Sequence, residues 1–117
     1  MAGQRDLSRL LAALDPVLHS ERYSFSTTED PTLGERDFAI VREAEGLALI
    51  APDPAGEWAR ISLGVHSSLD AVGLTAALSS QLANAGISAN IVAALYHDHI
   101  FVQWRRREEA LRLLRPA

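Results

Sequence analysis

The sequence predicts an α+β fold in which helices pack on an antiparallel sheet. Leucines repeat at helical spacing after both Leu7 and Leu74, which is the pattern of core-facing helices. The segment 58–65 alternates apolar and polar residues, as a half-buried strand does. Turn-forming Pro and Gly separate the remaining short apolar runs. A chain of 117 residues accommodates one globular unit, or two very small halves that share a core.

The first half, residues 1–55, is expected to contain one helix followed by three strands. A leucine stripe over 7–14 predicts the helix, with Asp6 as its cap, and Pro16 ends it near Asp15. Three runs rich in strand-forming residues follow, at 22–28, 38–43 and 47–51. A polar loop over 29–36 and a tight turn over 44–46 connect them.

The second half, residues 56–117, is expected to run strand–helix–strand–strand–helix. Two prolines and a glycine in 52–57 mark the boundary between the halves. Ser67 and Ser68 offer capping hydroxyls for the central helix, which Gly86 ends. The other elements are predicted at 58–65, 89–96, 100–104 and 106–115. His97-Asp98-His99 is predicted to form the turn between the last two strands.

One further strand would complete the βαββαβ arrangement of ferredoxin-like folds. We expect that strand to come from the first half or from a partner subunit, so that two halves share one antiparallel sheet. The strand at 89–96 is apolar on both faces, which predicts cover on both sides. One cover is the helix pair, and the other is the first half or a second copy of the chain.

Composition excludes several function classes. All 11 basic residues are Arg, so no Lys is present for Schiff-base catalysis, and the net charge of −4 argues against nucleic-acid binding. Cys is absent, which removes disulfides and thiolate ligands and fits a cytoplasmic location. No apolar run approaches the ~20 residues that span a bilayer, so neither export nor membrane insertion is expected. No cofactor is predicted.

Two long segments resemble the ACT domain. They are VHSSLDAVGLTA at 65–76 and GISANIVAALYHDHIFV at 86–102. The resemblance is to small prokaryotic proteins in which an ACT unit follows an ACT-like N-terminal half, and YSFSTT and FAIVREAEGLALI fit that first half. The His-Asp-His segment departs from common ACT domains.

This resemblance implies a regulatory or sensor protein without catalytic activity that binds a small molecule, usually an amino acid. In ACT proteins the ligand lies where the first strand meets the first helix, often between two units, which implies a homodimer and an unidentified regulated enzyme as partner. The ligand-binding residues that we predict on this basis are His66, Ser67, Ser68, Leu69, Asp70, Val72, Gly73, Asn90 and Ile91.

Elementary chemistry supports the same segment. A helix N-terminus offers unpaired N–H groups to a carboxylate, and Asp70 could accept from an α-ammonium group. Gly73 would allow a second surface to approach. The alternative is that the two serines only cap the helix and Asp70 complements its dipole. Asn90 could bond a ligand across an interface, or could simply end the turn after Gly86.

Two alternative functions remain open from the sequence. His97 and His99, with His66 as a third ligand, could serve a metal-dependent enzyme, although structural use of the His-Asp-His segment is the preferred interpretation and no metal site is predicted. No nucleophile motif or phosphate-binding loop supports catalysis. The chain could also be a structural protein–protein interaction module, with its sheet edge or apolar face docking a separate enzyme.

Overall fold

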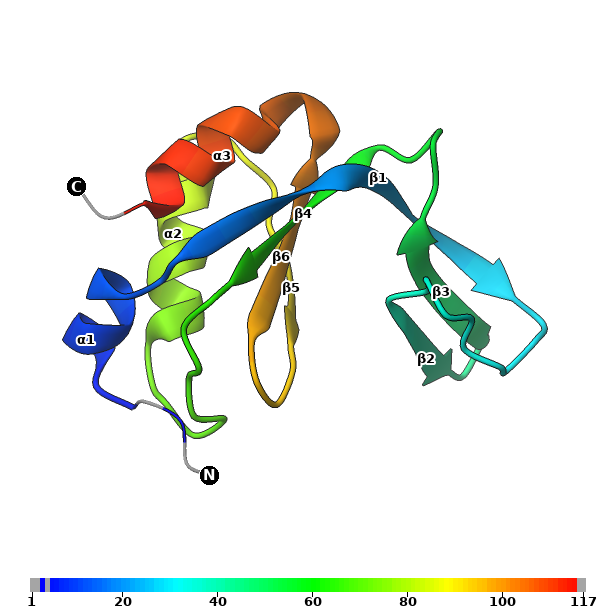
Figure 1. The fold of residues 1–117 in the computed structure, drawn as a ribbon, viewed down its shortest axis with the longest axis horizontal. Coiled ribbons are helices and arrows are strands. Elements are labelled where there is room, and N and C mark those ends of the chain that lie inside the picture. Colours follow the sequence, from blue (N-terminus) through cyan, green and yellow to red (C-terminus); the bar gives the residue numbers. More distant parts are fainter. Residues whose placement is uncertain (1–2, 4, 116–117) are drawn as a thin grey trace.

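The computed structural model describes residue 3 and residues 5–115, and these form one six-stranded antiparallel sheet with three α-helices on one face (Figure 1). None of the helices in this described part is long and apolar enough to cross a membrane. The elements are α1 (Leu7–Ala12), β1 (Pro16–Thr28), β2 (Ala39–Glu43), β3 (Gly46–Pro52), β4 (Trp58–Leu63), α2 (Leu74–Asn84), β5 (Asn90–Ala93), β6 (Asp98–Gln103), the 3-10 helix η1 (Trp104–Arg106) and α3 (Arg107–Leu114).

The strand order confirms the ferredoxin-like prediction and shows where the missing strand comes from. The order across the sheet is β2-β3-β1-β4-β6-β5. In the second half, β4, α2, β5, β6 and α3 supply all but the last element of βαββαβ. The first half completes it, because β1 pairs antiparallel with the free edge of β4.

The first half repeats the same strand order without the two helices. Its strands lie in the order β2-β3-β1-β4, which is the order second, third, first and fourth of a ferredoxin-like sheet. Strand β1 is therefore the first strand of one half and the last of the other, and β4 has the converse positions. The two halves share the middle of one sheet.

The main core lies between the sheet and the helices. On β4, Ala59, Ile61 and Leu63 point toward it and are fully buried, as the alternation predicted. The leucines of α2 pack against them. Helices α1 and α3 contribute the remaining fully buried helical side chains, Leu10, Ala110 and Leu114.

A second, smaller cluster lies on the opposite face of the sheet. Phe101 and Tyr23 are buried there beside Ile50, and Phe38 and Trp58 pack against them. Strand β1 carries an irregularity between Leu18 and Arg22, and the sheet curls so that the β2–β3 hairpin stands across from this face (Figure 1). The first half thus covers part of the sheet face opposite the helices, one of the two covers that the sequence allowed.

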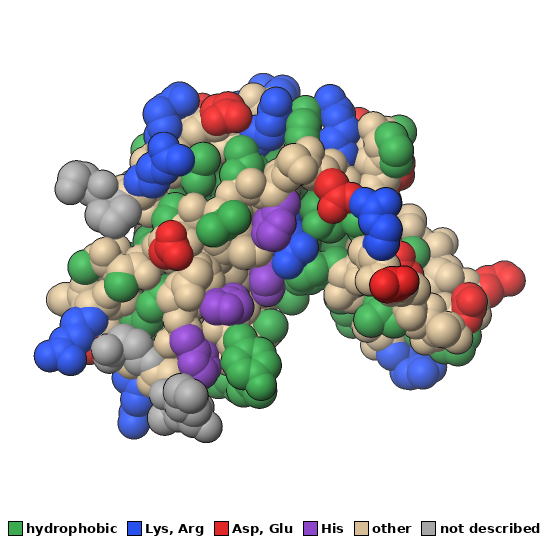
Figure 2. All heavy atoms as spheres, viewed as in Figure 1, with side chains coloured by type: hydrophobic (Ala, Val, Ile, Leu, Met, Phe, Trp, Pro, Cys, Tyr) green, Lys and Arg blue, Asp and Glu red, His purple; other side chains and the backbone are tan. Residues whose placement is uncertain are grey.

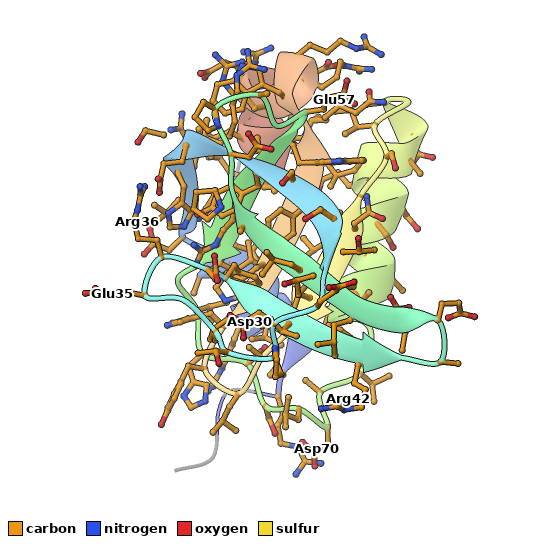
Figure 3. All side chains as sticks on the ribbon, turned by 90° about the vertical axis from the view of Figure 1, so that its right-hand side faces the viewer. Asp30, Glu35, Arg36, Arg42, Glu57 and Asp70 are labelled. Atoms are coloured by element: carbon orange, nitrogen blue, oxygen red, sulfur yellow. The ribbon has the colours of Figure 1, made fainter. Side chains whose placement is uncertain are left out.

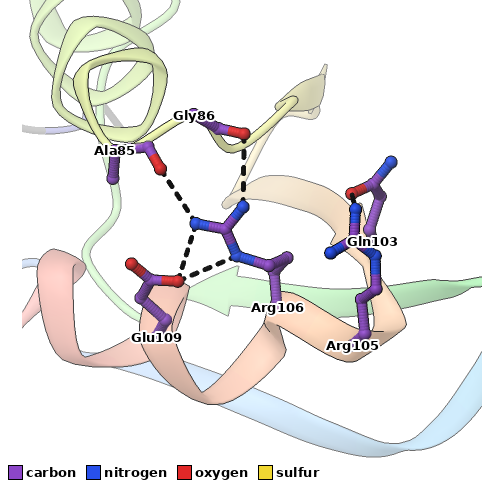
Figure 4. Close-up of polar contacts among 6 residues, drawn as sticks. All are labelled: Ala85, Gly86, Gln103, Arg105, Arg106 and Glu109. Carbon is purple, nitrogen blue, oxygen red and sulfur yellow. Dashed lines mark hydrogen bonds and ion pairs between the residues drawn. The ribbon is translucent and has the colours of Figure 1, made fainter.

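Arg106 fixes the far end of α2 to α3 (Figure 4). Its Nη2 donates to the carbonyl of Ala85 at 2.8 Å, and its Nη1 donates to Gly86 at 3.4 Å. The Nε also donates to Glu109 at 2.8 Å. These bonds satisfy carbonyl groups that a helix end leaves unpaired, so the C-terminal end of α2 is anchored while its N-terminal end leads into a loop.

Three local predictions were wrong. Strand β1 begins at Pro16 rather than at 22, because pairing of residues 16–18 with β4 extends the strand through a segment that also contains Pro16, Ser20 and Glu21, which propensity does not favour. Helix α2 begins at Leu74, so Ser67 and Ser68 lie in the preceding loop and do not cap it. The turn before β6 covers 94–97 instead of 97–99, which leaves Leu95 and Tyr96 exposed and places Asp98 and His99 in the strand.

Candidate functional site

The loop that connects β4 to α2, residues 64–73, contains most of the predicted site. Ser67 is buried, and its hydroxyl donates to the Asp98 carboxylate on β6 at 3.2 Å. The Ser68 hydroxyl donates to Asp70 at 2.5 Å. Arg5, from the segment before α1, forms an ion pair with Asp70 at 3.2 Å. The polar groups of the loop are thus tied to one another and to two neighbouring elements.

Asp70 lies at the opposite end of the molecule from Glu57 and is exposed there (Figure 3). The hydrogen bond from Ser68 lowers the pKa of its carboxyl, and the charge of Arg5 acts in the same direction. Asp70 is therefore an ionised carboxylate at neutral pH, a suitable acceptor for an ammonium group.

The N-terminus of α2 has no side-chain cap. Its N-cap is Gly73, at φ 97°, and no side chain bonds the first turn. This φ lies in the left-handed region that glycine tolerates. A side chain at position 73 would also meet Leu7 of α1 at 3.2 Å. The first-turn N–H groups of an 11-residue helix are consequently left to solvent or to a ligand.

A small hollow of about 70 Å³ lies at this helix N-terminus. Its polar lining residues are Ser67, Ser68, Thr75 and Asp98, and Leu74 and Ala93 are among its apolar walls. Cavities that bind small molecules usually measure ~300 Å³ or more. Within one chain, the hollow is therefore too small to enclose a ligand.

Backbone of the N-terminal segment covers part of this loop. A Cβ atom placed on Gly3 would lie 2.6 Å from the carbonyl carbon of Ser67 and 2.7 Å from the nitrogen of Ser68. Only a residue without a side chain allows so close an approach. No local pattern predicts this contact, because Gly3 lies more than sixty residues before Ser67 in the chain.

The structure brings some of the predicted site residues together and separates others. Leu69 and Val72 project from the loop and are 68% and 83% exposed. The ring of His66 lies 5.8 Å from that of Tyr96. Asn90 is the first residue of β5 and is exposed. It lies three residues before Ala93, which lines the hollow, and this spacing corresponds to about 10 Å along the strand. Ile91 packs against the main core.

Asp98 faces the loop 64–73 on one side of the sheet, whereas His97 and His99 face the opposite side. His97 contacts the carbonyl of Val65 at 3.5 Å, and His99 bonds Ser62. His66 does not join them, since it lies against Tyr96. In residues 3 and 5–115, no three His, Asp or Glu side chains are grouped so that they could hold a metal ion.

The chain thus combines an antiparallel sheet of ferredoxin-like order with a polar loop that leads into the N-terminus of α2. Family models described as ACT domains match residues 56–116 and, separately, residues 2–63. The chain belongs to the ACT domain family. The two matches overlap at β4, the strand that both halves use.

Solved structures include similar proteins. A protein of unknown function from Vibrio cholerae, titled a possible transport protein, is 40% identical, with a TM-score of 0.76 over 92% of each chain. A protein from Agrobacterium tumefaciens is 19% identical, with a TM-score of 0.57 over 79% of this chain and 78% of that one.

The ligand-free regulatory subunit of aspartate kinase from Thermus thermophilus shares the fold. It is 11% identical, with a TM-score of 0.64 over 88% of this chain and 95% of that one. Among curated proteins, no significant match is found.

Proposed function

We propose that this chain is a non-catalytic, cytoplasmic regulatory protein that binds an amino acid at the loop 64–73 and controls a separate enzyme. The observation that carries the proposal is the hollow at the uncapped N-terminus of α2 in a chain of the ACT family. The aspartate kinase regulatory subunit with the same fold supports a role in regulation.

The chemistry of the loop suits a zwitterion. First-turn N–H groups of α2 would bond the ligand carboxylate, where the partial positive charge of the helix N-terminus stabilises an anion. The ammonium group would bond Asp70, which is ionised and exposed. Arg5 now neutralises that carboxylate, so ligand binding would exchange one cation for another.

A second copy of the chain would complete the site. A hollow of about 70 Å³ needs another wall, and the exposed Leu69 and Val72 beside it offer apolar surface for a homodimer contact. Asn90 is too far along β5 to contact a ligand in this loop of its own chain, but it is exposed and could contact one held by a partner.

Thermal unfolding in the presence of each common amino acid tests the proposal. A ligand that binds only the folded state at 100-fold excess over its Kd adds about 2.7 kcal/mol, which corresponds to a rise in Tm on the order of 10 °C for a domain of this size. Sedimentation should show a dimer. A Tm that responds to no amino acid would contradict the proposal.

Two variants locate the site. Asp70→Asn removes the negative charge that would pair with the ammonium group and should lower affinity by about tenfold or more, as expected for loss of one charge-assisted hydrogen bond. Glu35→Gln removes the same charge from an exposed loop position that points away from the molecule (Figure 3), so its affinity should match that of the unchanged chain. Equal affinity in all three proteins would exclude Asp70 from the site.

A further inference from the structure

A row of polar side chains crosses the face of the sheet opposite the helices. His19 on β1, Ser62 on β4 and His99 on β6 lie on three neighbouring strands, and Ser62 and His99 are direct partners in the register. The Ser62 hydroxyl lies 2.7 Å from His19 Nε2 and 2.8 Å from His99 Nδ1. No local sequence pattern marks Ser62 or His19, because only the pairing of distant strands brings them together.

Arg60 sets the direction of hydrogen bonding in this row. Its Nη2 lies 3.5 Å from His99 Nδ1, and a guanidinium group can only donate. The guanidinium charge favours the tautomer in which His99 Nδ1 is the acceptor, and in that tautomer the Ser62 hydroxyl donates to Nδ1 while His19 Nε2–H donates to Ser62. The proton of His99 then resides on Nε2, which makes that atom a hydrogen-bond donor.

The charge of Arg60 meets only neutral partners. Its Nη1 donates to the Tyr23 hydroxyl at 3.0 Å, and its guanidinium carbon lies 4.5 Å from the centre of the Phe38 ring. The buried Nε has no hydrogen-bond partner among the described residues. A partly buried guanidinium is normally paired with an acid, and among the described residues Arg60 has no such partner.

A cavity of about 310 Å³ opens beside these groups, and we call it the Arg60 cavity. Its lining includes Val17, His19, Arg60, Leu63, His97 and His99. Figure 2 shows histidine side chains gathered along the hollow between the body and the β2–β3 hairpin, with a basic side chain beside them. No Asp or Glu lines the cavity in the part of the chain that the structure describes.

We propose that the Arg60 cavity binds the carboxylate of a small organic acid whose body is apolar. The remaining Nη hydrogens of Arg60 and the Nε2–H of His99 are the donors for that carboxylate, and charge-assisted bonds of this kind are the strong ones. Val17, which is exposed and pairs with Ser62, contacts the apolar body. The volume is at the lower end of the range for small-molecule sites, which limits the ligand to a few carbon atoms.

The Arg60 cavity adjoins the loop 64–73 at Gly64, but its polar groups differ from those of the loop. The two lie on opposite faces of β6, where Asp98 bonds Ser67 on one side and His99 bonds Ser62 on the other. The acid site therefore depends neither on a second copy of the chain nor on the amino-acid proposal.

Anion binding here should be coupled to protonation. Burial lowers the pKa of His99 to about 4, helped by the charge of Arg60 and by His97 and His19. Burial and Arg60 also lower the pKa of His19. A bound carboxylate offsets the charge of Arg60 and favours the imidazolium form, so the pKa of both groups should rise on binding and affinity should increase as pH falls.

Titration with isovalerate, its uncharged analogue isovaleramide, and sulfate tests the proposal. Imidazole NMR signals of His19 and His99 should shift with isovalerate. Isovaleramide should bind about tenfold more weakly or worse, because it lacks the charge. Sulfate should also bind more weakly, because it lacks the apolar body. Isovalerate should bind several-fold more tightly at about pH 5.5 than at about pH 7.5.

Arg60→Gln should lower isovalerate affinity by about tenfold or more. Arg42→Gln is the matched control, since it removes the same charge from an exposed position on β2, and it should leave affinity unchanged. If Arg60→Gln does not fold, the comparison of isovalerate with isovaleramide on the unchanged chain still tests the proposal. Equal binding of acid and amide, or histidine signals that do not respond to isovalerate, would overturn the proposal. Asp70→Asn should leave the affinity for isovalerate unchanged, because Asp70 does not line the Arg60 cavity. The proposal for the loop 64–73 and the proposal for the Arg60 cavity are therefore tested independently.

Discussion

Acidification from pH 6.5 toward pH 4 should destabilise this fold through His99. The imidazole lies between Ser62 and the ring of Phe38, whose centre is 4.9 Å away, and Arg60 lies beside it. Burial first, and then the charge of Arg60, lower the pKa of His99 to about 4 from 6.5. The unfolded chain therefore takes up a proton on His99 near pH 6.5, whereas the folded chain does not until about pH 4.

The sign and size of the effect follow from linkage. Between these two pKa values the unfolded state binds more protons, so the free energy of unfolding falls as pH falls from 6.5 toward 4. A shift of this size corresponds to about 3 kcal/mol without screening. His99 is partly solvated, and solvent screening reduces the expected loss to about 1–2 kcal/mol. Lowering of the pKa of His19 by burial adds to the loss in the same direction.

Urea unfolding followed by fluorescence of Trp58 and Trp104 measures the loss. We expect the free energy of unfolding to fall by about 1–2 kcal/mol more between pH 7 and pH 4.5 in the unchanged chain than in His99→Asn. The Asn side-chain oxygen can occupy the place of Nδ1 as an acceptor. His66→Asn is the control, because it removes a histidine that stacks on Tyr96 outside the row. Parallel pH profiles for the unchanged chain and His99→Asn would refute the reasoning.

Three further substitutions test the structure by the same urea measurement. Leu82→Ala removes a fully buried side chain of α2 and should cost about 2–5 kcal/mol; a loss under ~1 kcal/mol would contradict its place in the core. Gly56→Ala places a Cβ 2.2 Å from the carbonyl oxygen of Tyr23 and should cost several kcal/mol or prevent folding. Arg60→Met replaces a charge without an acidic partner and should raise stability by about 1 kcal/mol; a large loss would show that the bond to Tyr23 dominates.

Local patterns predicted the elements of the second half well. Alternation placed Ala59, Ile61 and Leu63 toward the helices, and all three are fully buried. Helical spacing identified α2 and the inward face of α3. The missing strand also followed from counting elements, because a ferredoxin-like sheet has four. Each of these predictions depends on residues close together in the sequence.

What the sequence could not predict depends on distant contacts. The first part of β1 mixes apolar residues with Pro16, Ser20 and Glu21, and its strand conformation comes from pairing with β4. The close contact of Gly3 with the loop 64–73 has no local signal. The Arg60 cavity needs β1, β4 and β6 side by side, and nothing in the spacing of His19 and His99 shows that both bond one serine.

Sharing of β1 and β4 between the two halves has a practical consequence for anyone who wishes to dissect the protein. A fragment cut before residue 56 at the loop between β3 and β4 would retain both helices of the second half, yet it would expose the whole edge of β4 that β1 now pairs with. Bare edges of this kind recruit strands from other molecules. Such a fragment should aggregate or exchange strands with its neighbours, whereas adding back a peptide with the sequence of β1 should restore a soluble sheet.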